Sequence, residues 1–157
     1  MQIRVDSECS LRRVADHCHG ALLNVDRARY ETGSQKFSLT LVRQMREKLE
    51  WERAFLFLQR WRVPKVESEL VFHHVEHVAC DWRDVQDVLD DISYDASRPA
   101  VVLQGAAGTR ISLAVKELSG HLGDIGTEYF DGTTFTSIGC THPKAVLRCQ
   151  PAGRSER

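Results

Sequence analysis

Histidine is the residue type in this sequence with the clearest capacity for chemistry, and three histidines lie close together with a carboxylate. His73, His74, Glu76 and His77 fall within five consecutive positions. Imidazole nitrogens and carboxylate oxygens are ligands that zinc accepts in proteins. The cluster therefore supports an alternative hypothesis to a protein without a cofactor, a transition-metal site that holds zinc, and hydrolysis is the activity that such a site would support.

The spacing of these four residues limits the zinc hypothesis. On an extended strand His73 and His77 share a face but stand roughly 13 Å apart, too far for one ion unless the chain bends between them. His74 and Glu76 are closer, at positions i and i+2. On a helix His73 and His77 would chelate one ion, but the alternating apolar pattern around them favours a strand. Exposed or hydrogen-bonded histidines on a sheet are therefore the favoured interpretation, and the zinc site is the alternative.

Two further patterns do not give a catalytic site. His17 and His19 flank Cys18, but on a helix each ring projects about 100° away from the thiol and is poorly placed to take its proton. Residues 105–108, Gly-Ala-Ala-Gly, are followed by Thr109 and Arg110. No Lys-Ser/Thr pair or helix follows, so this segment predicts a hairpin turn rather than a phosphate-binding loop. No catalytic residue is assigned from the sequence.

Charge is segregated along the chain, although 21 basic and 22 acidic residues leave a net charge of -1. Residues 43–65 hold seven basic and three acidic side chains, whereas residues 66–95 hold one and nine. Complementary charged faces favour a protein partner or self-association. Arg60, Trp61 and Arg62 are residue types that contact single-stranded nucleic acid. The neighbouring acidic segment would repel a phosphate backbone, so nucleic acid is not the expected partner.

Apolar periodicity predicts one helix near the N-terminus. The residues Leu11, Val14, Ala15, Cys18 and Leu22 recur with the spacing of one helix face. Ser10 or Ser7 can cap the start of this helix, and Asn24 can end it.

Most of the remaining chain alternates with a period of two, which is typical of strands. The expected strands cover residues 28–30, 36–45, 53–62, 66–80 with a bulge near His73 and His74, 92–94, 100–103 and 109–115. A short helix or ordered loop is expected within Asp81–Asp95. The predicted fold class is α+β, a largely antiparallel sheet of roughly six to eight strands with the N-terminal amphipathic helix packed on it. Residues 1–130 are expected to form a single domain and residues 131–157 a loosely ordered C-terminal tail.

Three segments give this order of elements a familiar form: ELVFHHVEHV, DDISYD and RISLAVKELSGHLGDI, which follow the helix and the hairpin from Tyr30 to Leu41. The chain resembles, over roughly residues 11–126, a family of small uncharacterised bacterial proteins grouped as a domain of unknown function. The resemblance implies the fold and a bacterial source. It carries no functional motif and assigns no role to the histidines.

Cysteine usage and hydropathy predict a cytoplasmic location. Five cysteines without a CxxC pair fit neither a disulfide framework nor a zinc ribbon. The N-terminal segment carries charges at Arg4, Asp6 and Glu8 where a signal peptide would be apolar. The longest apolar run, Ala54–Leu58, is five residues, against about 18 for a membrane span.

Taken together, these patterns favour a non-enzymatic binding or assembly module that acts through an exposed strand edge or through the charged faces. The alternative hypothesis is the zinc-binding protein that uses His73, His74, Glu76 and His77.

Overall fold

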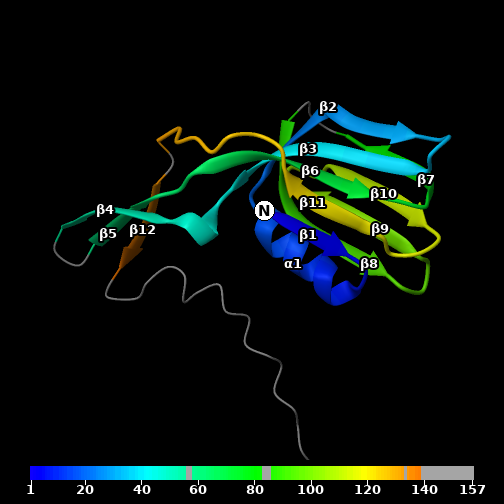
Figure 1. The fold of residues 1–157 in the computed structure, drawn as a ribbon, viewed down its shortest axis with the longest axis horizontal. Coiled ribbons are helices and arrows are strands. Elements are labelled where there is room, and N and C mark those ends of the chain that lie inside the picture. Colours follow the sequence, from blue (N-terminus) through cyan, green and yellow to red (C-terminus); the bar gives the residue numbers. More distant parts are fainter. Residues whose placement is uncertain (56–57, 83–85, 133, 139–157) are drawn as a thin grey trace, which may run out of the picture. The chain divides into compact units, whose positions relative to one another are not determined.

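The computed structural model describes the chain except for residues 56–57, 83–85, 133 and 139–157 (Figure 1). Within the described residues there are one α-helix, α1 (Glu8–Cys18), one short 3-10 helix, η1 (Arg46–Lys48), and twelve strands. The strands are β1 (Gln2–Val5), β2 (Leu22–Glu31), β3 (Lys36–Gln44), β4 (Glu50–Phe55), β5 (Leu58–Arg62), β6 (Lys65–Phe72), β7 (Val75–Asp81), β8 (Gln86–Asp95), β9 (Ala100–Gly105), β10 (Arg110–Val115), β11 (Gly120–Asp124) and β12 (Thr134–Ile138). The strands fall into two compact units, one formed by Met1–Gln44 and Lys65–Tyr129, the other by Met45–Pro64 and the described residues from Phe130 to Ile138.

Helix α1 starts at a reciprocal cap. The hydroxyl of Ser7 accepts a hydrogen bond from the Ser10 backbone N–H (3.3 Å), and the hydroxyl of Ser10 accepts one from the Ser7 backbone N–H (3.0 Å). This arrangement satisfies N–H groups that the first turn of a helix leaves without an intrahelical partner. Leu11, Val14 and Cys18 are buried on one face of the helix, as the apolar spacing predicts.

The helix ends earlier than the sequence predicts. It stops at Cys18, because Gly20 adopts a left-handed φ of 78° and the Ala21 N–H bonds back to the Cys18 carbonyl (2.8 Å). Leu22 and Asn24, expected at the end of the helix, belong to β2 instead. No helix in the described part of the chain has the length and apolar character needed to cross a membrane.

The first unit contains a nine-stranded antiparallel sheet in the order β1-β11-β6-β3-β2-β8-β9-β10-β7. Strand β8 belongs to both parts of this sheet. Its residues Gln86–Val88 pair with β2, and from Leu89 onward the strand pairs with β9, with a register shift between Leu89 and Asp91. Because β8 changes partner, the sheet turns back on itself, with β1, β11, β6, β3 and β2 in one layer and β8, β9, β10 and β7 in the other (Figure 1). The α+β prediction is confirmed, with more strands than expected.

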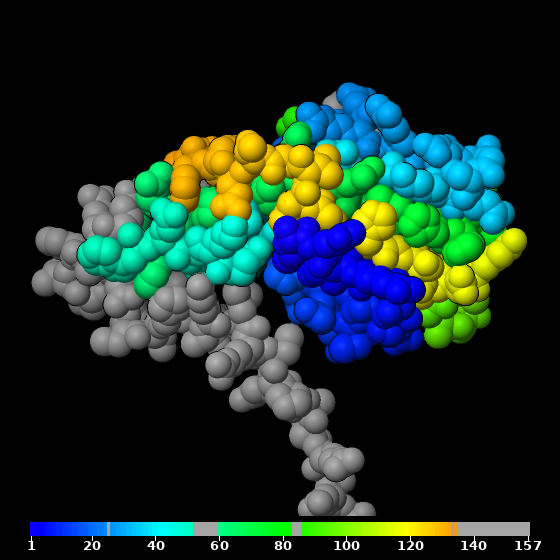
Figure 2. Space-filling view, in the orientation of Figure 1, coloured from blue at the N-terminus to red at the C-terminus, as the bar shows by residue number. Residues whose placement is uncertain are grey.

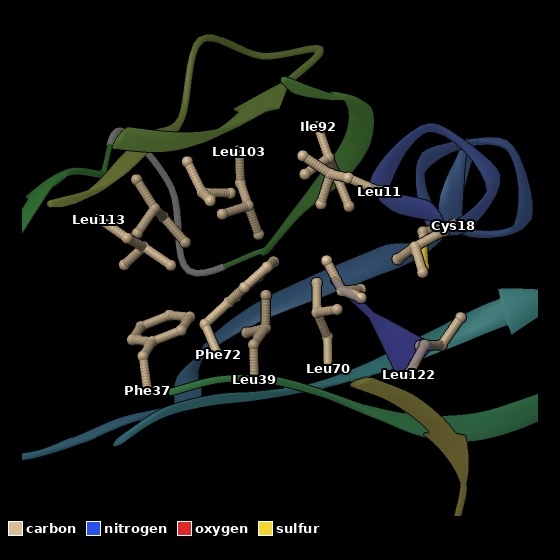
Figure 3. Packing of buried hydrophobic residues seen from close by; sticks show 14 of the residues in the cluster. Leu11, Cys18, Phe37, Leu39, Leu70, Phe72, Ile92, Leu103, Leu113 and Leu122 are labelled. Carbon is tan, nitrogen blue, oxygen red and sulfur yellow. The ribbon is translucent and has the colours of Figure 1, made fainter. Parts of the chain in front are cut away.

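The two layers and α1 enclose one hydrophobic core. Figure 3 shows Phe37, Leu39, Leu70 and Phe72 of the first layer pointing toward Ile92, Leu103 and Leu113 of the second, with Leu11 and Cys18 of α1 at one end. All of these side chains are buried. The alternation that predicted Leu70 and Phe72 as inward-facing is therefore confirmed.

The single strand predicted over residues 66–80 is wrong, because this segment forms two strands in different layers. Strand β6 pairs with β3 and β11, whereas β7 pairs with β10. Between them His74 takes a left-handed φ of 56°. The His73 N–H donates to the Ser119 carbonyl and the Val75 N–H to the Gln35 carbonyl, both at 2.9 Å. The expected bulge is thus the turn that carries the chain from one layer to the other.

The helix or loop expected within Asp81–Asp95 is wrong over residues 86–91, which belong to β8 together with the strand predicted over residues 92–94, and residues 83–85 of this segment lie outside the described residues. Asp87 is buried there, and its Oδ1 accepts from the backbone N–H groups of Val88 (2.7 Å) and Ala107 (2.9 Å). Its Oδ2 accepts from the Thr109 N–H (3.1 Å). Burial acts to raise the pKa of Asp87, but hydrogen bonds from Thr109 and the backbone amides outweigh it and lower the pKa.

A buried arginine joins three strands of the first layer. Arg43 of β3 is 0% exposed. Its Nε donates to Asp124 Oδ1 on β11 (3.0 Å) and to Ser68 Oγ on β6 (3.2 Å), and its Nη2 donates to Asp124 Oδ2 (2.9 Å). Ser68 Oγ and the Met1 amino group donate to the same carboxylate at 2.7 and 2.8 Å. These donors hold the pKa of Asp124 well below its ordinary value, although burial opposes them.

In the second unit, β12, β5 and β4 form a three-stranded antiparallel sheet. Trp61 is only 7% exposed, so the ring that the sequence offered for base stacking is packed inside the protein. The guanidinium carbon of Arg62 lies 4.1 Å from the centre of the Phe130 ring, a cation-π contact. Strand β12 falls within residues 131–157, for which a loose tail is predicted, and residues 139–157 of that tail lie outside the described residues.

Replacing Phe72 with alanine should lower the free energy of unfolding by about 3–5 kcal/mol, because the ring is fully buried between the two layers. Urea denaturation measures this change. Arg110→Ala, at an exposed position of β10, is the control and should stay within about 0.5 kcal/mol of the parent protein. A Phe72→Ala variant as stable as this control would contradict the assignment of Phe72 to the core.

Replacing Asp124 with asparagine keeps the side-chain shape but leaves the charge of Arg43 buried without its counter-charge, which should cost about 3–5 kcal/mol. Folding lowers the pKa of Asp124, so its ionised form stabilises the folded protein. This stabilisation is fully present above the unfolded pKa of about 3.9 and is lost as the pH falls through the folded pKa. The acid limb of a stability-against-pH curve should therefore be flatter in Asp124→Asn than in the parent. Asp91→Asn, at an exposed carboxylate, should keep the parent's limb.

Candidate functional site

Of the strand edges that have no partner strand among the described residues, those of β7 and of the second half of β2 lie near each other. Strand β7 is the last in the sheet order and pairs with β10 alone. Strand β2 pairs with β8 only over Leu22–Asn24, so its residues Ala28–Glu31 have β3 on one side and no described strand on the other. We call the strip between Ala28–Glu31 of β2 and Val75–Asp81 of β7 the seam.

Contacts at one end of the seam show that its two edges face each other. The Tyr30 hydroxyl donates to the Val75 carbonyl (2.9 Å) and lies 3.1 Å from the Glu76 carbonyl. The Val75 N–H donates to the carbonyl of Gln35, in the turn between β2 and β3 (2.9 Å). A tyrosine side chain, and no backbone ladder, therefore connects β2 to β7 at this point. From His77 to Asp81 the edge of β7 has no neighbouring strand in the described structure.

The inward-facing side chains on both sides of the seam are incompletely covered. Cross-strand pairing places Ala28 and Tyr30 opposite Leu39 and Phe37, and Val78 and Cys80 opposite Leu113 and Ile111. The partners on β3 and β10 are all 1% exposed or less. In contrast, the side chains on the seam are half-buried, and Cys80 is exposed. The core thus ends at the seam with apolar surface still in contact with solvent.

Polar side chains border this apolar strip. The β7 side carries Glu76, His77 and Asp81, all exposed. Lys116 Nζ lies 3.7 Å from Glu76 Oε1 and partly balances its charge. An apolar centre with a polar border is the composition that protein-binding surfaces commonly have.

Cys18 and Cys80 are poor nucleophiles, because the pKa of each thiol is raised. The side chain of Cys80 is exposed, but neighbouring atoms partly desolvate its thiol and raise its pKa, with a hydrogen bond from Trp82 acting in the opposite direction. Burial raises the pKa of Cys18 to about 12, and the nearby Arg43 charge offsets only part of that rise. The Cys18 side chain points into the core (Figure 3), and His19 Nδ1 instead lies 2.7 Å from the Asp90 carbonyl. A Cys-His pair is therefore not formed by these residues.

The four residues of the predicted zinc site have separate neighbours. His73 stacks on His121 with ring centroids 5.8 Å apart, His74 Nε2 lies 3.2 Å from Glu117 Oε1, Glu76 faces Lys116, and His77 is exposed on β7. Among the described residues, no group of three or more His, Cys, Asp or Glu side chains is placed to hold one metal ion. The zinc hypothesis stays a prediction. The structure adds His121, which sequence spacing could not connect to His73 because only the β6–β11 pairing brings them together.

The charged segments also lie differently from the sequence pattern. Arg43, counted in the basic segment, is buried and paired with Asp124. Glu67, counted in the acidic segment, bonds to Arg27 of β2. The outward residues of β2, β3 and β6 surround a hollow of about 510 Å³ that contains both signs of charge. These charges are therefore balanced to a large extent on their own face of the sheet.

Comparison of the chain with protein-family models, with curated proteins and with solved structures finds no match. The resemblance to a bacterial domain of unknown function accordingly stays a prediction, and the function is argued from the geometry.

Cysteine alkylation should follow the exposure and pKa of each thiol in the first unit. Iodoacetamide at about pH 8 should label exposed Cys9 first, Cys80 more slowly because its pKa is raised, and Cys18 only after unfolding. Peptide mass spectrometry after timed quenching gives the three rates. Labelling of Cys18 at the rate of Cys9 in the folded protein would contradict its position in the core.

Proposed function

We propose that this protein is a binding module that accepts an extended segment of a protein partner as an additional β-strand along the seam. The observation that carries the proposal is the coincidence of two unpartnered strand edges with apolar side chains that point inward and are only partly covered. A strand edge presents a row of backbone donors and acceptors, which an incoming peptide can pair with.

The seam specifies the chemistry of its ligand. A guest strand beside β7 would place every second side chain over Val78 and Cys80, so apolar residues are required at alternate positions. The side chains between them would point toward Glu76, His77 and Asp81, so polar residues that include lysine or arginine suit those positions. Tyr30 already occupies the carbonyls of Val75 and Glu76, and the guest strand would therefore lie along His77–Asp81.

A strand edge explains more of the described surface than the charged faces do. Arg43 is paired with Asp124 in the interior, and Glu67 is paired with Arg27 on the same face of the sheet. Both charges therefore have a counter-charge within the protein. In contrast, Ala28, Tyr30 and Val78 still expose part of their apolar surface. A bound strand that covered them would remove this surface from water, which is favourable.

The test uses a fluorescent peptide of about eight residues in which valine alternates with threonine and lysine, the length of an ordinary strand. Its affinity for the full chain is measured by fluorescence anisotropy. Cys80→Lys places an inward-pointing charge on the seam and should weaken binding at least about tenfold. Ala79→Lys is the matched control, since it adds the same charge at the next position on the exposed outward side and should change the affinity by less than about twofold.

A second peptide, N-methylated at alternate residues, separates backbone pairing from general hydrophobic contact, because it keeps the side chains but lacks half of the N–H donors. Loss of binding with this peptide supports strand addition. Equal binding of both peptides, or equal weakening by Cys80→Lys and Ala79→Lys, would refute the proposal. Dimerisation of the parent protein that Cys80→Lys abolishes would instead identify a second copy of the chain as the occupant and overturn the assignment to a separate partner.

A further inference from the structure

A second concave region lies on the outer surface of the first unit, between β1, β11 and the turn from β6 to β7. A groove of about 480 Å³ is lined there by Gln2, Arg4, His73, Ser119, Gly120 and His121. Strand β1 pairs with β11 so that Arg4 lies directly opposite His121. These two strands lie side by side on the face seen in Figure 2, in dark blue and yellow.

The side chains that line this groove supply positive charge and hydrogen-bond donors. Arg4 provides a guanidinium, His73 and His121 provide two imidazoles, and Gln2 and Ser119 provide an amide and a hydroxyl. No carboxylate is among these lining residues. His73 and His121 stack with ring centroids 5.8 Å apart and an interplanar angle of 29°, which fixes the two imidazoles next to each other.

Further positive groups surround His73. Burial lowers the pKa of His73, and the neighbouring charges of His121, His74 and Lys36 lower it further. The groups that lower the pKa come from β11, from the turn before β7 and from β3. The free groove therefore disfavours a proton on His73 until a negative charge enters.

Two carboxylates near the groove, Asp6 and Glu117, do not line it and have partners of their own. Asp6 Oδ2 lies 3.9 Å from Arg4 Nε, and both side chains are exposed to solvent. Glu117 is paired with His74 on the other side of the turn. Arg4 itself is 84% exposed, so its side chain is free to reorient toward a ligand.

We propose that this groove binds an oxyanion of the phosphate class, held by Arg4 and by the imidazoles of His73 and His121. Guanidinium and imidazolium groups donate charge-assisted hydrogen bonds to phosphate oxygens, and Arg4 can donate two of them at once. The bound anion stabilises the protonated imidazoles, so binding is coupled to proton uptake. This site is independent of the seam and uses none of the residues proposed to hold a peptide.

The direction of the pH dependence distinguishes an oxyanion from a metal ion. Protonated histidines attract phosphate, so phosphate affinity should rise as the pH falls from about 8 to about 6. Metal ions require the neutral imidazole, so zinc affinity should fall over the same range. The same two histidines thus predict opposite slopes for the two ligands.

The experiment is calorimetric titration of the full chain with inorganic phosphate, phenyl phosphate and Zn²⁺, each at about pH 6 and about pH 8. Phosphate should bind about tenfold more tightly at the lower pH. His73→Gln with His121→Gln, and separately Arg4→Gln, should each weaken phosphate binding about tenfold or more. His77→Gln and Arg13→Gln are matched controls at exposed positions outside the groove and should bind phosphate as the parent does.

Each outcome decides the proposal. Tighter binding of phenyl phosphate than of inorganic phosphate identifies an ester as the ligand, and equal binding identifies the free anion; both support the oxyanion site. Phosphate binding that is unchanged in Arg4→Gln and in the double histidine variant overturns it. Zinc binding with the opposite pH slope, lost in the double histidine variant while phosphate fails to bind, would also overturn it and assign the groove to a metal. The Arg4 variant keeps the test valid if the histidine variant is destabilised, because Arg4 is outside the core.

Discussion

The change of partner within β8 is the constraint on which the rest of the first unit depends. Over Gln86–Val88 this strand pairs with β2 of the first layer, and from Leu89 onward it pairs with β9 and starts the second. The inward-facing carboxylate of Asp87 stabilises that corner, because it accepts hydrogen bonds from its own strand and from the turn between β9 and β10. The turn must approach closely for this to happen. A Cβ at Gly105 would lie 2.1 Å from Asp87 Oδ2, so glycine is the residue that this contact permits.

The open seam follows from where β8 begins. The antiparallel pairing places Asn24 of β2 opposite Gln86, the first residue of β8, so the second half of β2 extends past the start of β8, and the second layer ends at β7 without pairing with β2. A closed barrel would have paired these two edges through their backbones. Here Tyr30 makes the only described hydrogen bonds from β2 to β7, and they run from a side chain. The half-covered state of Val78 is therefore a consequence of sheet topology and not of a weak apolar sequence.

Local patterns predicted the elements of this fold well and its long-range pairings poorly. Alternation identified β3, β6 and β10, and helical spacing identified α1, because both patterns depend on neighbours within a few residues. The division of residues 66–80 into two strands was not predicted. Apolar alternation continues through His73 and His74, and it carries no signal for the left-handed turn at His74. The alternation in β3 places Arg43 on the same face as Phe37 and Leu41, but its pairing with Asp124 joins residues 81 apart in sequence, and no local pattern identifies that partner. The histidine cluster was found as a cluster, but its spatial partner His121 was not.

The left-handed turn at His74 determines where both proposed sites lie. On its N-terminal side, His73 leaves β6 on the outer face and meets His121 across the β6–β11 pairing. On its C-terminal side, Val75 enters β7 and contacts Tyr30 at the end of the seam. A polar groove and an apolar strip are thus separated by one residue of chain, yet they face different ligands because the turn transfers the chain between layers. The neighbouring histidines in the sequence consequently act apart in space, His73 among cationic groups and His77 beside an unpartnered strand edge.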